Sequence, residues 1–115
     1  MSGQERRQST RFDMEILLSI RTLEIPRSLA RAGMTENISA TGLFLASDLP
    51  FEIGAPLEIS LCMPERVTGK PQCEWRCRGR VVRVQAQDEQ HEKPGAAVVF
   101  QYYEVVARDR ARFKN

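Results

Sequence analysis

The stretch LEISLCM at residues 57–63 decides the fold class of this chain. Apolar side chains stand at every second position, and the residues between them are charged, polar or small. A period of two is typical of a β-strand that turns one face to a core and the other to water. We therefore expect Leu57, Ile59, Leu61 and Met63 to point inward.

Similar patterns recur on both sides of this stretch. Apolar residues alternate with others over residues 14–21, and Pro26 indicates a turn after them. A second strand is expected over residues 29–38, with Met34 and Ile38 on its inner face. Further strands are expected over residues 43–46, 72–84 and 96–100.

Two segments depart from simple alternation. In the strand at residues 72–84, Trp75 and Cys77 share one face, whereas Val82 and Val84 have the opposite phase. A bulge near residues 78–80 would bring the two halves onto one face. At the end of the chain, the apolar spacing of Tyr102, Val105, Val106 and Phe113 predicts a helix.

Six short strands and one terminal helix favour an all-β fold, an antiparallel barrel or closed sandwich. A parallel α/β fold is disfavoured because crossover helices between the strands are missing. We divide the chain into a flexible N-terminal arm at residues 1–12, a barrel at residues 13–101, and a C-terminal helix and tail at residues 102–115.

Composition limits the function. The 115 residues fit one domain, and 42% hydrophobic and 28% charged residues are ordinary for a globular protein. The chain has no apolar run of bilayer length and no apolar signal-peptide core, so we expect a cytoplasmic protein with no membrane insertion. A net charge of +2 is too small to indicate non-specific DNA binding by itself.

Metal binding and catalysis are not expected. Three cysteines, an odd number, agree with a reducing compartment. Cys73 and Cys77 are four residues apart, but the single histidine, His91, lies in a polar, loop-like stretch. A zinc site normally needs four ligands, so we interpret the cysteines as free thiols packed on a sheet. No nucleophile–base pair or carboxylate dyad suggests an enzyme.

Two polar clusters carry the functional signal. Arg6, Arg7 and Arg11 lie in the N-terminal arm, and an arginine fork can pair with phosphate or with a guanine edge. Asn37 and Ser39 are two residues apart on a predicted strand, so both are expected to point to the same face, while Ile38 anchors the core. Gly42 follows and permits a positive φ or a close backbone approach to a ligand.

The order Arg-x-x-x-Arg (residues 7–11) and Asn-x-Ser-x-x-Gly (residues 37–42), with a strand between them, resembles the PilZ domain family. The resemblance continues through NISATGL (37–43), GAPLEISL (54–61), CRGRVVRV (77–84) and PGAAVVF (94–100), and it covers nearly the whole chain. Where this chain has Asn37, the family often has aspartate.

The resemblance implies a six-stranded antiparallel β-barrel of the split-barrel type that binds cyclic di-GMP, a bacterial second messenger. It assigns Arg7 and Arg11 to the phosphates and guanine edges of the ligand, Asn37 and Ser39 to a guanine, and Gly42 to the shape of the loop. It implies that Arg6 favours an intercalated ligand dimer, so we expect a stoichiometry of 2:1.

On this interpretation the chain is a receptor that needs no cofactor and whose arm closes over the ligand and presents a new surface to a protein partner. Two alternatives remain. The barrel could serve as an interaction adaptor that does not depend on the nucleotide. It could also bind nucleic acid through the arginines at residues 76–83, but its aromatic content of 7% disfavours base stacking on the strands.

Overall fold

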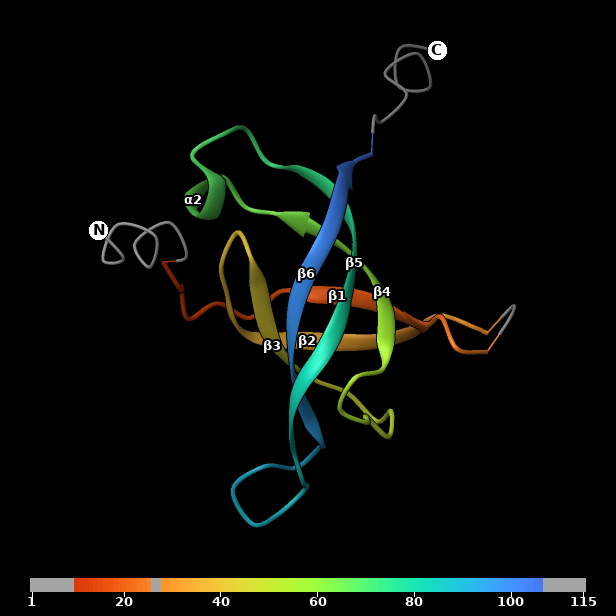
Figure 1. The fold of residues 1–115 in the computed structure, drawn as a ribbon. Helices are drawn as coiled ribbons and strands as arrows, with labels where there is room; N and C mark the ends of the chain where they lie inside the picture. The colour runs from red at the N-terminus through yellow and green to blue at the C-terminus, as the bar shows by residue number, and fades with distance from the viewer. Residues whose placement is uncertain (1–9, 26–27, 107–115) are drawn as a thin grey trace, which may run out of the picture.

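The computed structural model describes residues 10–25 and 28–106, which form a closed barrel of six antiparallel strands (Figure 1). The order of neighbours around the barrel is β1-β2-β3-β6-β5-β4. The all-β barrel predicted from the sequence is therefore confirmed. Its strands are β1 (Leu17–Thr22), β2 (Arg31–Ile38), β3 (Gly42–Ala46), β4 (Pro56–Met63), β5 (Cys73–Gln85) and β6 (Gly95–Val105).

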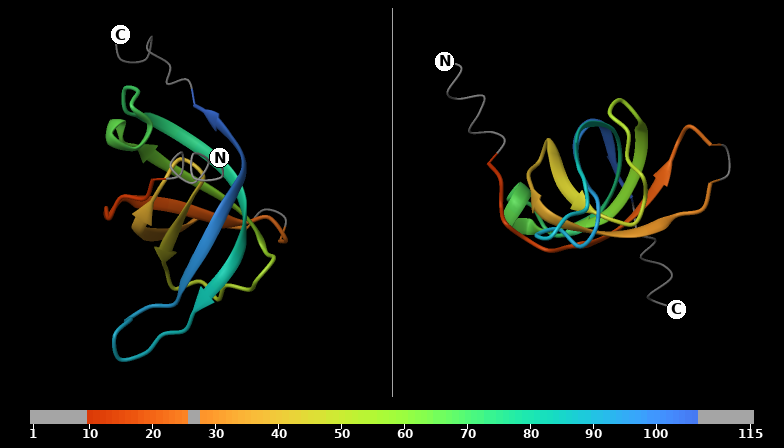
Figure 2. Two further views of the ribbon diagram at one scale, coloured as in Figure 1. Left: turned by 60° about the vertical axis from the view of Figure 1, so that its left-hand side comes forward. Right: turned by 90° about the horizontal axis from the view of Figure 1, so that it is seen from below.

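The strands differ in length, and this gives the molecule its shape. β5 has 13 residues and β6 has 11, whereas β1 and β3 have only 6 and 5. The long β5–β6 pair therefore crosses the whole barrel and extends beyond it (Figure 2). The connection between β4 and β5 contains the short helix α2 (Glu65–Thr68). Its C-terminal cap is Gly69, whose φ is 77°.

The core follows from the alternation in β4. Leu57, Ile59, Leu61 and Met63 are all buried, as the sequence predicted. Buried side chains from the other five strands meet them inside the barrel: Leu18, Ile20, Ile38, Leu43, Leu45, Trp75, Cys77, Val81, Ala96 and Val98. Burial of this apolar surface is the main force that closes the barrel.

The inner face of β2 was predicted wrongly at one position. Met34 is 36% exposed, and Thr35 takes its place inside the barrel. The reason is a bulge, because the pairing with β3 shifts between Thr35 and Asn37. A bulge leaves one extra residue unpaired and reverses the phase of the alternation beyond it. Ile38 consequently does point inward, as expected.

Bulges occur in β5, as predicted, but they do not bring Val82 and Val84 onto the inner face of the barrel. The pairing with β6 shifts between Arg78 and Gly79 and again between Val81 and Arg83. Val82 and Val84 nevertheless remain exposed, and Val81 is the buried residue. The inward phase that begins at Trp75 therefore continues unbroken to Val81.

The predicted C-terminal helix does not begin at Tyr102. Residues 102–105 continue β6, where Tyr102 pairs with Arg78 and Val105 pairs with Trp75. Pairing with β5 thus overrides the helical spacing of the apolar residues. Residues 107–115 lie outside the described part of the chain. In the part that the structure describes, no helix is long and apolar enough to cross a membrane.

Candidate functional site

The segment that precedes β1 lies along β2. The hydroxyl of Thr35 donates a hydrogen bond to the carbonyl of Met14 (2.6 Å) and accepts one from the backbone N–H of Ile16 (2.8 Å). Further along, Phe12 and Ile38 exchange two backbone hydrogen bonds of 2.8 and 2.9 Å. These contacts fasten the base of the N-terminal arm to the end of β2 and bring the two polar clusters of the sequence together.

Arg11 and Asn37 meet directly. The guanidinium of Arg11 donates from Nη1 to Oδ1 of Asn37 across 2.8 Å, although the residues are 26 positions apart in the chain. Arg11 is exposed, and Asn37 is half-buried. A flexible arm, as the sequence predicts, would leave its arginines without protein partners, and this expectation is wrong for Arg11. The bond holds one guanidinium beside the amide at an accessible surface.

Ser39 does not share the exposed face of Asn37, contrary to the prediction. β2 ends at Ile38, and Ser39 begins a tight turn in which its N–H bonds the carbonyl of Gly42 (2.8 Å). Its hydroxyl is buried, 3.2 Å from the backbone N–H of Thr41 and 3.2 Å from the carbonyl of Gly42. This hydroxyl stabilises the shape of the turn next to Asn37.

Gly42 is the first residue of β3, and its φ is not positive. A Cβ atom at this position would overlap the backbone carbonyl oxygen of Val98 in β6. Gly42 therefore permits the backbone of β3 to approach the backbone of β6 closely, and not a ligand. It allows the turn at residues 39–42 to lie tightly against the barrel.

One cation beside this site was not found from the sequence. Arg66, in α2, lies with its guanidinium 5.4 Å from the ring centroid of Phe12, within the range of a cation–π contact. Only the fold brings Arg66 next to Phe12, because the two residues are far apart in the chain and no motif links them. Arg6 and Arg7 lie outside the described residues.

An open pocket of about 410 Å³ lies next to the turn. It is lined by Ala40 and Thr41 from the turn and by residues 100–103 of β6. Below it, Tyr103 stacks on the buried Trp75, with ring centroids 3.9 Å apart and planes at 3°. Trp75 is therefore part of the packed core and shares the inner face with Cys77, as the sequence predicted.

A family model described as PilZ domain matches residues 5–114. The chain belongs to the PilZ domain family. PilZ domains are generally receptors for cyclic di-GMP and typically lack enzymatic activity. Arg7, Arg11, Asn37, Ser39 and Gly42 all lie within the matched region.

Two solved structures share this PilZ fold. The structure of Bacillus subtilis inhibitor of motility (MotI/DgrA) is 25% identical, with a TM-score of 0.64 over 93% of this chain and 47% of that chain. The chain thus spans about half of that protein. The PilZ domain of CeSA from a cellulose synthesizing bacterium is 17% identical, with a TM-score of 0.55 over 82% of both chains. Among curated proteins, none matches the sequence.

The cysteines of this PilZ domain are all free thiols. Cys62 is exposed, whereas Cys77 is buried in the barrel, where desolvation raises the pKa of its thiol to about 12. A thiol with so high a pKa is protonated at neutral pH and is a poor nucleophile and metal ligand. Across residues 10–25 and 28–106, no three histidine, cysteine or acidic side chains are grouped to hold a metal ion.

Proposed function

We propose that this PilZ domain binds cyclic di-GMP between its N-terminal arm and the end of β2. The observation that carries the proposal is the hydrogen bond between Arg11 and Asn37, because it joins the second arginine of one motif to the first residue of the other. The backbone contacts between Phe12 and Ile38 hold the two motifs together independently of any ligand. Arg11 and Asn37 are therefore already in contact before a ligand binds.

The residues match the chemistry of this ligand. Cyclic di-GMP carries two phosphate charges and two guanine bases. Arginine forks bind phosphate oxygens and the O6 and N7 atoms of guanine, and the amide of Asn37 has both a donor and an acceptor for a base edge. Arg11 and Asn37 would exchange their mutual hydrogen bond for bonds to the ligand. Arg66 lies next to Phe12 and would add positive charge to the same region.

The remaining predicted residues have different roles in the proposal. Arg7 contacts the phosphates from the arm, and Arg6 favours the intercalated dimer and a stoichiometry of 2:1. Ser39 acts through the turn that it stabilises, next to the guanine that Asn37 binds. Ligand contacts from Arg6 and Arg7 then close the arm over the site, and the closed arm forms part of the surface that a partner recognises.

Calorimetry of the full chain tests this proposal. We expect heat of binding with micromolar ligand, and a loss of affinity of about tenfold or more in Arg7→Ala and in Arg11→Ala, since each removes charged hydrogen bonds. Arg31→Ala is a matched control, because Arg31 is exposed at the opposite end of β2. Absence of binding by the wild type would favour the adaptor that does not depend on the nucleotide.

A further inference from the structure

The outer surface of β4, β5 and β6 carries a second group of arginines, on strands other than the one that holds Asn37. Arg76, Arg78 and Arg80 stand at alternate positions of β5, so all three point outward from the barrel. Beside them on β6 lie the exposed side chains of Tyr102 and Val99, which pair with Arg78 and Arg80. We call these five residues the arginine face.

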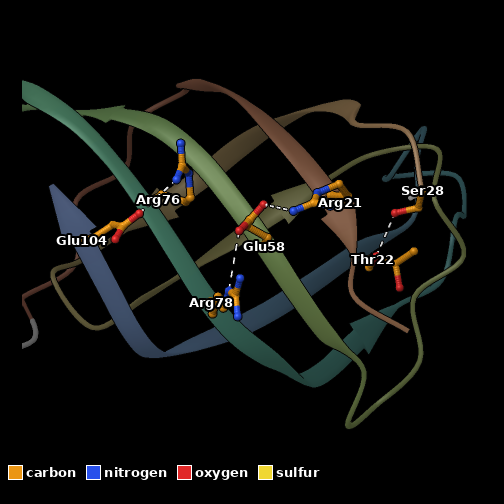
Figure 3. Close-up of polar contacts among 7 residues, drawn as sticks. All are labelled: Arg21, Thr22, Ser28, Glu58, Arg76, Arg78 and Glu104. Carbon is orange, nitrogen blue, oxygen red and sulfur yellow. Dashed lines mark hydrogen bonds and ion pairs between the residues drawn. The ribbon is translucent and has the colours of Figure 1, made fainter. Parts of the chain in front are cut away.

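Carboxylates on the neighbouring strands hold parts of this face in place (Figure 3). Glu58 on β4 accepts a hydrogen bond from Arg21 on β1 (2.5 Å) and lies 3.6 Å from Nε of Arg78. Arg76 and Glu104 form an ion pair of 3.0 Å. Side chains that are already fixed on a rigid sheet lose little conformational entropy when a partner binds.

Glu58, whose carboxylate contacts both Arg21 and Arg78, is charged at neutral pH. Burial by itself would raise the pKa of Glu58, but the hydrogen bond from Arg21 and the positive charges of Arg21, Arg78 and Arg76 lower it by more. The side chain of Glu58 is only 11% exposed, whereas those of Arg76 and Arg78 are 45% and 55% exposed. The negative charge is therefore sheltered in the sheet while the guanidinium groups face the solvent.

Positive charge remains in excess on this surface. Four arginines, at positions 21, 76, 78 and 80, stand against three glutamates, at positions 58, 74 and 104. Arg80 donates to the backbone carbonyl of Gly54 at 2.7 Å, and this contact fixes its position without neutralising its charge. The face thus combines arginine and tyrosine, the residue types enriched at interfaces, with a small excess of positive charge that is carried by Arg80.

We infer that the arginine face is a docking surface for a protein partner that presents an acidic patch. Charge complementarity selects an acidic surface. A protein can place its carboxylates opposite the arginines alone, whereas the regularly spaced phosphates of a nucleic acid would also meet the glutamates. The exposed apolar side chains of Val99 and Tyr102 likewise suit a protein surface.

The docking surface adjoins the proposed ligand site. Tyr102 and Thr41 line the same pocket, and Thr41 belongs to the turn that follows Asn37. A structural change at that turn can therefore be transmitted through β6 to the arginine face. The inference rests on one part of the proposed function, namely that the receptor acts on a protein partner. It applies equally to an adaptor that does not depend on the nucleotide.

Titration of the isotope-labelled full chain with a short peptide of alternating glutamate and serine tests the surface. At low salt we expect saturable amide shifts around Arg76, Arg78 and Tyr102, and none with a lysine–serine peptide of the same length. Arg76→Gln/Arg80→Gln should weaken binding about tenfold, since it removes two positive charges and spares the Glu58 bridge. Glu104→Gln should tighten binding about twofold by removing a repelling charge.

The outcomes separate this inference from the proposed function. The double variant should bind cyclic di-GMP as the wild type does, with an unchanged circular dichroism spectrum. Peptide shifts confined to other strands, or equal peptide affinity in wild type, double variant and Glu104→Gln, would overturn the inference. Tighter binding of a short DNA duplex than of the acidic peptide at the same residues would overturn it in favour of a nucleic-acid surface.

Discussion

At the scale of single residues, Gly42 shows how a motif position can serve the fold and the site together. The sequence suggested a positive φ or a close approach to a ligand. The structure shows instead that Gly42 lies against the backbone of β6, where a side chain has no room. Its neighbour Ser39 is buried for a related reason, because its hydroxyl bonds the backbone of the same turn.

Gly42→Ala should therefore destabilise the barrel. The added methyl group would overlap the carbonyl oxygen of Val98, and β3 would have to move away from β6. We expect the free energy of unfolding in urea to fall by about 1–3 kcal/mol, the usual range for overpacking. Gly69→Ala is the comparison for backbone strain without crowding: Gly69 has open space around it, and its φ of 77° alone should cost about 1 kcal/mol. Unchanged stability with impaired ligand binding would instead assign Gly42 to the ligand.

At the scale of strands, the alternation of residues along β4 was enough to predict which side chains are buried. The same rule failed in β2, because a bulge between Thr35 and Asn37 reverses the phase and no residue type there signals it. It also failed at the end of β6, where pairing with β5 decides the structure of residues 102–105. Bulges and strand pairing depend on partners distant in the chain, so local patterns do not reveal them.

The pairing of β1, β4 and β5 through Glu58 predicts a dependence of stability on pH. The pKa of Glu58 is lower in the folded protein than in the unfolded chain. Its charge therefore adds stability above the ordinary glutamate pKa of about 4.3, and this contribution disappears as the pH falls through the lowered value. We expect Glu58→Gln to melt at a lower temperature than the wild type at pH near 7.

The difference in melting temperature should shrink to nothing as the pH is lowered well below about 4. Glu15→Gln is the control, because Glu15 is exposed and has no ion pair among those found in the described residues. If the difference in melting temperature between Glu58→Gln and the wild type stayed constant down to low pH, Glu58 would stabilise the fold by its packing and not by its charge.

At the scale of the whole molecule, closure of the barrel brings together what the sequence separates. The base of the arm, the turn after β2 and α2 lie near one another because β2 pairs with the segment before β1 and Arg66 covers Phe12 (Figure 1). The motifs alone indicated a site shared by residues 7–11 and 37–42. They could not indicate the resting bond between Arg11 and Asn37 or the neighbouring arginine of α2.

Binding of cyclic di-GMP at the Arg11–Asn37 contact is tested by nuclear magnetic resonance spectra of the labelled full chain during titration with this ligand. We predict saturable shifts of the Asn37 side-chain amide and the Arg11 guanidinium, together with backbone shifts over residues 38–42, because the ligand replaces the bond between these two side chains. Signals of Arg31 and Glu24, at the opposite end of β1 and β2, should not move. An unchanged Asn37 amide at saturating ligand, or shifts confined to other parts of the barrel, would contradict the account.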